Sequence, residues 1–152
     1  MSDWRSEIDT ALDLFITVAE LAGDPIVPGE ILVEYQEAPH RPPSRLPAGR
    51  MAVYCFWGDG CWLKVGKAGP NSNARYTSQH YNPGSAQSTL AASLAKDPRM
   101  LSVTGFDSLA PGPWIRHSTH RVNLLVPAGR SPEFLSLLEA FLHLRLRPRY
   151  EG

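Results

Sequence analysis

The sequence predicts an α+β fold, because three stretches carry two different periodicities. Residues 3–22 repeat apolar side chains at helical spacing, residues 52–66 form two apolar runs around a Gly-Asp-Gly turn, and residues 121–126 form another short apolar run. The first pattern favours an amphipathic helix and the other two favour strands. A chain of 152 residues suffices for one domain around one core, and we expect no second folded domain.

The N-terminal helix is expected to end at Gly23, and a proline-rich stretch follows it. The apolar positions of this helix are Trp4, Ile8, Leu12, Phe15 and Ala19. Residues 38–49 contain four prolines, which predicts an irregular connection. We therefore divide the chain into an acidic helical segment (1–37), a proline-rich connector (38–50) and a main domain (51–152).

Glycine and proline divide the main domain into further elements. Gly69-Pro70 and Asn82-Pro83-Gly84 separate two predicted short helices, over residues 72–80 and 87–96. A final helix is expected to begin at Ser131-Pro132-Glu133, where the serine caps the first turn, proline fits it and glutamate complements the helix dipole.

The formal net charge of zero is the sum of two unlike parts. Residues 1–37 carry nine acidic residues against Arg5 alone, a net charge of −8. Residues 38–152 carry fourteen lysines and arginines against six acidic residues, a net charge of +8. This asymmetry has two interpretations: a polyanionic partner binds the basic part, or two oppositely charged surfaces are simply solvated.

No apolar run of the sequence is long enough to cross a membrane. The first five residues, MSDWR, also lack the basic start and apolar run of an export signal. We therefore expect a cytoplasmic protein without membrane contact, in which Cys55 and Cys61 are reduced, packed thiols.

A zinc site is considered and rejected. Cys55, Cys61, His117 and His120 could supply four ligands, but C-x5-C and H-x2-H do not match the usual structural spacings. Both thiols are also expected to face the core, where a cysteine is inert as a nucleophile.

The strands of residues 52–66 have a predicted register. If Gly58-Asp59-Gly60 is a three-residue loop, Tyr54 lies directly opposite Lys64. One face is then apolar throughout, with Val53, Cys55, Trp57, Cys61, Leu63 and Val65, and the other carries Ala52, Tyr54, Phe56, Trp62, Lys64 and Gly66. A nearby ammonium favours a phenolate, so we expect Lys64 to lower the pKa of Tyr54.

These strands also carry a resemblance to a known family. Ala52-Val53-Tyr54 and Lys64-Val65-Gly66 resemble the paired tripeptides that name the GIY-YIG nucleases, with lysine where the family usually has tyrosine. Arg75 in the following helix fits the pattern, and EAFLHLRLRPRY at 139–150 is similar to the ending of the family's excision-repair members. Glu151 then stands where those members have asparagine. The resemblance covers roughly residues 50–152.

The resemblance implies a small three-stranded antiparallel sheet flanked by helices, to which the N-terminal helix is an addition. It also implies metal-dependent hydrolysis of phosphodiester bonds. Glu139 would then hold Mg²⁺ or Mn²⁺ against the phosphate, Arg75 would stabilise its charge, and Tyr54, kept acidic by Lys64, would activate water. His80 has three interpretations: it takes the proton of the water, donates to the phosphate or caps the end of its helix.

Each of these residues also has a purely structural interpretation. Tyr54 would be an ordinary strand tyrosine, and Lys64 and Arg75 would be solvated surface charges. Glu139 lies at the margin of an apolar helix face, where a half-buried carboxylate needs a cation. If that cation is a side chain, it is expected to be Arg75 or Lys64, whereas His143, one turn later, is expected to be exposed.

The predicted partner is nucleic acid, with DNA favoured. Lys67 follows the second strand in a glycine-flanked loop, where it would contact a phosphate or remain solvated. Tyr76, Arg147 and Arg149 are the other residues expected to contact nucleic acid. The acidic N-terminal helix would pack on the main domain as plain structure, act as a lid that competes with DNA, or contact a protein partner.

Two other functions compete with the nuclease. The departures at Lys64 and Glu151 favour a nucleic-acid-binding module that has lost catalysis, whereas the presence of Tyr54, Arg75 and Glu139 counts against it. The third candidate is a purely protein-binding regulator.

Overall fold

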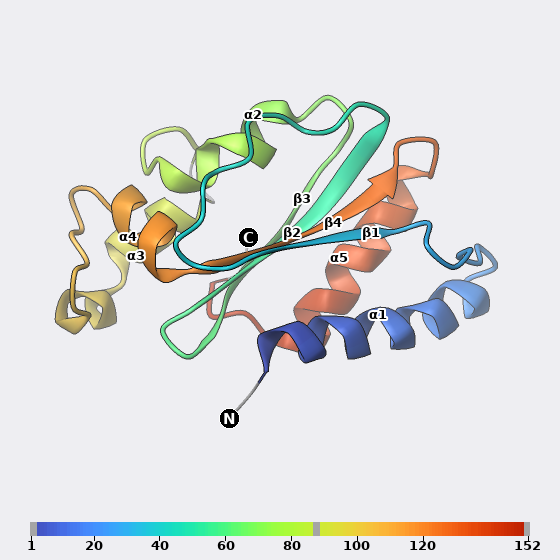
Figure 1. Cartoon of the computed structure of the whole chain (residues 1–152), viewed down its shortest axis with the longest axis horizontal. Coiled ribbons are helices and arrows are strands. Elements are labelled where there is room, and N and C mark those ends of the chain that lie inside the picture. Colours follow the sequence, from blue (N-terminus) through green and yellow to red (C-terminus); the bar gives the residue numbers. More distant parts are fainter. Residues whose placement is uncertain (1–2, 87–88, 151–152) are drawn as a thin grey trace.

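The computed structural model of the chain describes residues 3–86 and 89–150 and has an antiparallel four-stranded sheet at its centre (Figure 1). The strands are β1 (Leu32–Gln36), β2 (Arg50–Gly58), β3 (Cys61–Ala68) and β4 (His120–Pro127). Their order across the sheet is β1-β4-β2-β3. The α+β class is confirmed, although the sheet has four strands where three were predicted.

Helices cover both faces of this sheet (Figure 1). Two long ones, α1 (Trp4–Leu21) and α5 (Pro132–Leu146), pack on one face against Val53, Cys55 and Leu124. The other face, which carries Tyr54 and Phe56, is covered by short helices. These are α2 (Asn73–Thr77), the 3₁₀ helix η1 (Gln79–Tyr81), α3 (Leu90–Lys96), the 3₁₀ helix η2 (Pro98–Ser102) and α4 (Gly112–Ser118).

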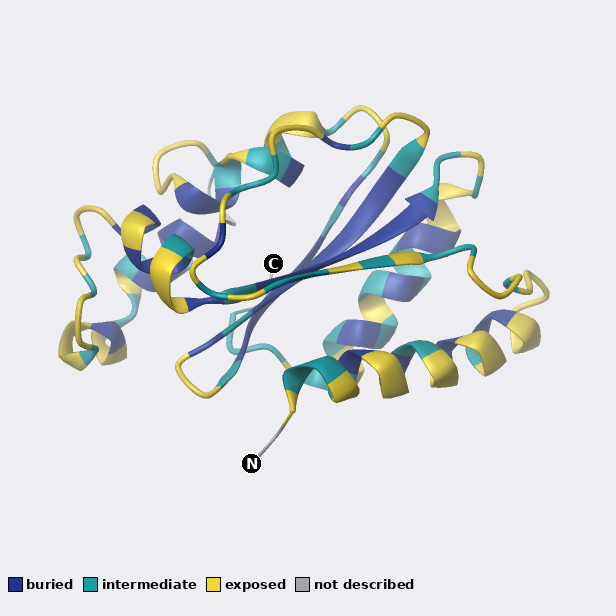
Figure 2. Cartoon of the chain, in the orientation of Figure 1, coloured by how far each residue is buried: buried dark blue, intermediate teal, exposed yellow. Residues whose placement is uncertain are grey.

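The N-terminal helix is part of the core. The side chain of Asp3 caps α1 by accepting a hydrogen bond from the backbone N–H of Arg5 at 3.0 Å. Ile8, Phe15 and other apolar residues of α1 are fully buried against α5 and the sheet, while its opposite face is exposed (Figure 2). Because α1 lies on the sheet face opposite Tyr54, the structure favours plain packing over a lid.

The acidic segment also supplies a strand that the sequence pattern did not predict. Along its length β1 pairs with β4, from Leu32 opposite Leu125 to Gln36 opposite Arg121. Arg130, in the turn after β4, holds the segment further through ion pairs to Glu30 at 2.5 Å and Asp24 at 2.8 Å. The segment 1–37 is thus joined to the sheet as well as to its helical face.

The other predicted elements are present with shifted ends. The helix expected over residues 72–80 is divided into α2 and η1, and the strand expected over residues 121–126 is β4. The helix expected over residues 87–96 is described from Leu90 onward, and residues 87–88 lie outside the described part of the chain. The hydroxyl of Ser131 accepts a hydrogen bond from the N–H of Phe134 at 3.1 Å, which confirms the cap of α5. Among the described residues, no helix is long and apolar enough to span a bilayer.

The register predicted for the hairpin is wrong. Gly58 pairs with Cys61, so the turn has two residues, Asp59 and Gly60, both with positive φ (51° and 76°). Asp-Gly suits such a turn, because its backbone twist matches that of the two strands. A bulge next to Phe56 shifts the pairing further, so that Phe56 lies opposite Lys64 and Tyr54 lies opposite Gly66.

The bulge also redistributes the side chains near the turn. Trp62 packs with the α1 side of the sheet, where its Nε1–H donates to Glu7 Oε2 at 2.7 Å, and Leu63 packs on the opposite face. The predicted placement of these two residues is therefore reversed. Cys55 and Cys61 also belong to different faces, which leaves both thiols free and separates them.

Candidate active site

The side chain of Tyr54, on the inner strand β2, lies over the neighbouring edge strand β3. It is fully buried on β2, and its ring covers Gly66 of the edge strand β3. A Cβ atom on Gly66 would come within 2.9 Å of both Cζ and Oη of Tyr54. The absence of a side chain at Gly66 therefore allows the phenol to reach the β3 edge.

This close approach predicts the effect of a single methyl group. Gly66→Ala should lower the free energy of unfolding by about 1–3 kcal/mol, because the ring of Tyr54 has little room to move. Urea denaturation measures this change. Gly129→Ala is the matched control, since a Cβ at Gly129 meets no atom within 4 Å. Equal stabilities of the two variants would contradict the packing described here.

His80 fixes the hydrogen bonding of Tyr54. Its Nε2 lies 2.6 Å from Tyr54 Oη, and its Nδ1 accepts the backbone N–H of Leu90 at 3.0 Å. Since Nδ1 is an acceptor, the neutral ring carries its proton on Nε2 and donates it to the phenol oxygen. Burial, Arg75, Arg121 and Lys64 lower the pKa of His80 to about 2. His80 is therefore a neutral ring that holds Tyr54 and accepts the first N–H of α3, a contact different from the predicted cap at the end of its own helix.

The expectation that the pKa of Tyr54 is lowered is wrong. Burial raises this pKa to about 12, and the charge of Glu139 adds to the increase. Arg75 and Arg121 act in the opposite direction, Arg75 through its charge and through a hydrogen bond to the phenol. Tyr54 is thus a phenol at neutral pH.

The same interactions link three predicted site residues. Arg75, from α2, and Glu139, from α5, both act on the hydroxyl of Tyr54, from β2. They also act on Lys64 of β3, which Glu139 favours and Arg75 disfavours in its charged form. Phenol, guanidinium, amine and carboxylate from four elements therefore lie near enough to one another for their charges to interact.

Lys64 is buried without a partner. Its exposed fraction is 0 %, and within residues 3–86 and 89–150 its Nζ has no hydrogen-bond partner. Burial, with the charge of Arg75, lowers its pKa to about 8. Its interpretation as a solvated surface lysine is excluded.

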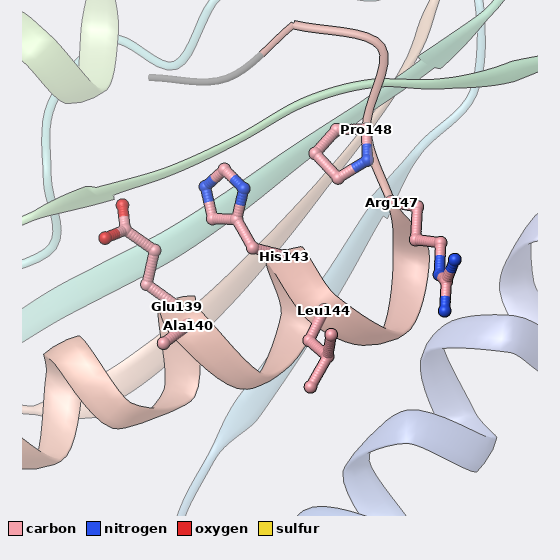
Figure 3. Close-up of a pocket in the computed structure, with 6 residues that line it drawn as sticks. All are labelled: Glu139, Ala140, His143, Leu144, Arg147 and Pro148. Atoms are coloured by element: carbon pink, nitrogen blue, oxygen red, sulfur yellow. The ribbon is translucent and has the colours of Figure 1, made fainter.

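Glu139 borders an open hollow. Its side chain is 24 % exposed, and its Oε1 lies 3.7 Å from Nζ of Lys67, which also donates to Ser136 Oγ at 2.8 Å. Glu139 therefore has an ion-pair partner, Lys67, that the sequence did not predict for it. The hollow has a volume of about 740 Å³ and is lined by Glu139, Ala140, His143, Leu144, Arg147 and Pro148. Figure 3 shows the Glu139 carboxylate and the His143 ring on the same side of α5.

The donor set at this hollow fits a hard divalent cation bound through few protein oxygens. The described residues include no group of three or more His, Cys, Asp or Glu side chains that could hold a metal. Mg²⁺ commonly keeps several waters and takes one or two carboxylates together with substrate phosphate. Glu139 could supply the carboxylate, and the hollow beside it leaves space for the waters.

The residues predicted to contact nucleic acid differ in their access to solvent. Lys67 is half exposed, and Arg147 is exposed and lines the hollow beside Glu139. Arg149 is largely buried and forms an ion pair with Asp59 at 3.1 Å. Tyr76 is 1 % exposed in a cluster with Ala52 and other apolar residues, so its prediction as a nucleic-acid contact is wrong.

Arg121 is a central residue that the sequence analysis missed. It is fully buried on β4, and its guanidinium carbon lies 5.1 Å from the centroid of the Tyr54 ring. Its nitrogens donate to Asn123 Oδ1 at 2.7 Å, to the Tyr76 carbonyl at 2.7 Å and to the Tyr81 hydroxyl at 3.1 Å. Arg121 therefore packs against the ring of Tyr54, and its hydrogen bonds connect β4 to α2 and η1. In the sequence, its signal is the pair of polar residues Arg121 and Asn123, which alternate within an otherwise apolar strand.

The C-terminal residues form backbone hydrogen bonds with the edge strand β3 beside the site. The N–H groups of Arg149 and Tyr150 donate to the carbonyls of Trp62 at 2.9 Å and Leu63 at 3.0 Å. The hydroxyl of Tyr150 donates to Asp97 at 2.6 Å, which fixes this segment against the short helices. The covered part of the β3 edge thus ends next to Lys64.

Two buried histidines predict a loss of stability in acid. Burial lowers the pKa of His40 to about 4 and that of His80 to about 2, both below the 6.5 of an unfolded histidine. The unfolded chain binds more protons below pH 6.5, so the free energy of unfolding should fall as pH decreases. We expect a slope of about 1.4 kcal/mol per pH unit for each histidine between pH 6.5 and 4.

Urea denaturation at intervals of half a pH unit measures this slope. His117→Asn is a control, because His117 is exposed on α4. A stability that stays constant between pH 6.5 and 4.5 would contradict the neutral state of both buried rings.

Comparison of the chain with protein-family models, with curated proteins and with solved structures gave no match.

Proposed function

We propose that the protein is a metal-dependent endonuclease that hydrolyses phosphodiester bonds of nucleic acid, with DNA as the favoured substrate. The observation that carries this proposal is that Arg75 forms a hydrogen bond with the phenol of Tyr54 while the charge of Glu139 acts on the same hydroxyl. These are the residues that the resemblance to GIY-YIG nucleases assigns to catalysis, and they come from three distant segments.

Each of the three side chains has a role that follows from its contacts. Arg75 offers a planar, charged donor for the phosphate, whose charge increases in the transition state. Tyr54 donates its own proton, because its oxygen already accepts from His80 and Arg75. Glu139 would hold Mg²⁺ or Mn²⁺, which when bound supplies Lewis-acid stabilisation of the phosphate.

The distribution of charge supports a polyanionic substrate. The strand β1 of the acidic segment lies at the edge of the sheet opposite β3, whereas Glu7 of α1 contacts Trp62 of β3. Lys67 forms an ion pair with Glu139, and Arg147 lines the same hollow as Glu139. Basic side chains around the site would attract a phosphate backbone, and binding should weaken as salt increases.

A plasmid-cleavage assay tests the proposal. Supercoiled plasmid is incubated with the protein and Mg²⁺ or Mn²⁺, with a chelator in the control, and binding to a labelled duplex is followed at low salt. Metal-dependent nicked or linear product would support a nuclease. Binding without cleavage under either metal would favour the module that has lost catalysis, and the absence of binding would favour the protein-binding regulator.

A further inference from the structure

Lys64 is the buried polar group whose position has no structural explanation. Its Nζ is the one buried side-chain nitrogen or oxygen without a hydrogen-bond partner in the described part of the chain. A buried polar group left without a partner is costly, and an apolar residue would suit the neighbour across the strand, Phe56. Such a group at a candidate active site indicates a ligand or a reaction.

The surroundings of Lys64 contain all the groups of the candidate site. Tyr54 lies diagonally across the hairpin on the same face, one pair of residues further along β2. Arg75 of α2 and Glu139 of α5 act on the charge of Lys64, and Lys64 acts on His80 of η1. The charge of the amine therefore interacts with those of the cluster, and within residues 3–86 and 89–150 no carboxylate forms an ion pair with it.

The three candidate proton acceptors differ in whether their lone pair is free. The oxygen of Tyr54 is occupied by donors, and its pKa of about 12 keeps it protonated. Nδ1 of His80 is occupied by the N–H of Leu90. Lys64 has an unoccupied nitrogen, and its pKa of about 8 leaves part of the population neutral near neutral pH. Groups whose pKa values are moved apart in this way divide the roles of acid and base.

We propose that Lys64 is the general base that takes a proton from the water attacking the phosphodiester. This inference rests on the proposed nuclease function. As the water oxygen bonds to phosphorus, one of its O–H bonds breaks and the proton passes to the lone pair of Nζ. The bond from phosphorus to the leaving oxygen breaks, and that oxygen takes the proton of Tyr54 Oη. Solvent then returns a proton to Tyr54 and removes one from Lys64.

Lys64 would then take over the role of the tyrosine that the GIY-YIG nucleases usually have at this position. The resemblance places a tyrosine here, and its absence suggested a missing catalytic group. A buried lysine with an unoccupied nitrogen keeps a titratable group at the same place on β3.

The experiment separates the base from a simple positive charge. Lys64→Arg keeps a cation but removes the base, and Lys64→Met removes both. We expect Lys64→Arg to lose about 10²–10⁴-fold in single-turnover cleavage rate, with affinity for the labelled duplex within about threefold of wild type. The wild-type rate should rise with pH and level off near pH 8, and the residual rate of Lys64→Arg should lack this break. Lys96→Arg is the control, because Lys96 is exposed on α3.

A second measurement needs no variant at the site and no activity. The chain has three lysines, Lys64, Lys67 and Lys96, so the ε-carbons of isotopically labelled lysine give three NMR signals. We expect the Lys64 signal to titrate near pH 8. If Lys64 stays charged up to pH 10, Lys64 is not the general base. A wild-type cleavage rate for Lys64→Arg would lead to the same conclusion, and either result would leave the nuclease function intact. Absence of cleavage by the wild-type protein with either metal would overturn both.

Discussion

Glu139→Gln is expected to reduce cleavage about 1,000-fold or more while the protein remains folded and binds the duplex. The substitution keeps the shape of the side chain but removes the charge that would hold a divalent cation. A metal contributes several kcal/mol to transition-state stabilisation, and about 4 kcal/mol corresponds to a factor of about 1,000. Lys67 would lose its ion pair, but that pair is long, at 3.7 Å, and half exposed, so its loss should change stability little.

The measurement is single-turnover cleavage at increasing Mg²⁺ and Mn²⁺, with duplex binding followed in parallel. Glu133→Gln is the matched control, because it removes an exposed carboxylate from the first turn of the same helix. If Glu139→Gln cleaves at the wild-type rate, Glu139 has no role in metal binding and the proposed mechanism is lost.

Arg121→Met is expected to be the most destabilising of these substitutions, by about 3–5 kcal/mol. Methionine fills a similar volume, so the loss arises from hydrogen bonds. The Tyr76 carbonyl and the Asn123 amide oxygen would be left without the donor that each has now. Tyr81 would keep one partner, His40 Nε2 at 2.7 Å.

Urea denaturation at pH 7 measures the change. Arg145→Met is the matched control and should change the free energy of unfolding by less than about 0.5 kcal/mol, because Arg145 is exposed on α5. A variant at Arg121 as stable as this control would show that the buried guanidinium contributes nothing net to the fold.

The sequence predicted the elements whose signals are local. The helical spacing of residues 3–22 and the cap at Ser131 depend on neighbouring residues alone, and both are present as expected. The strand β1 could not be predicted in the same way. Its residues, LVEYQ, do not alternate strictly, and its pairing with β4 depends on contacts about 90 residues away.

The hairpin shows how a short signal can be misread. The apolar runs of residues 52–66 were interpreted correctly as paired strands, but the register was chosen to keep one face apolar. The structure instead uses a two-residue turn and a bulge, which move Lys64 from Tyr54 to Phe56. A bulge changes the face of every residue beyond it, and periodicity cannot reveal it.

The candidate site was predicted better than its electrostatics. Arg75 and Glu139 both act on the hydroxyl of Tyr54, whereas the predicted direction of the Tyr54 pKa was wrong because burial outweighs the nearby cations. Arg121 and the burial of Tyr76 were missed for the same reason: which side chains lose contact with water is set by helices that fold over the sheet from distant parts of the chain.

The backbone bonds of Arg149 and Tyr150 to β3 have a consequence for association between copies of the chain. An outermost strand with free carbonyl and N–H groups is a template to which another molecule can add a strand. Here the last described residues occupy that position at Trp62 and Leu63. Removal of Arg149 and Tyr150 would expose the carbonyl groups of Trp62 and Leu63 at the β3 edge. We then expect dimers or larger aggregates in which β3 strands of different molecules pair.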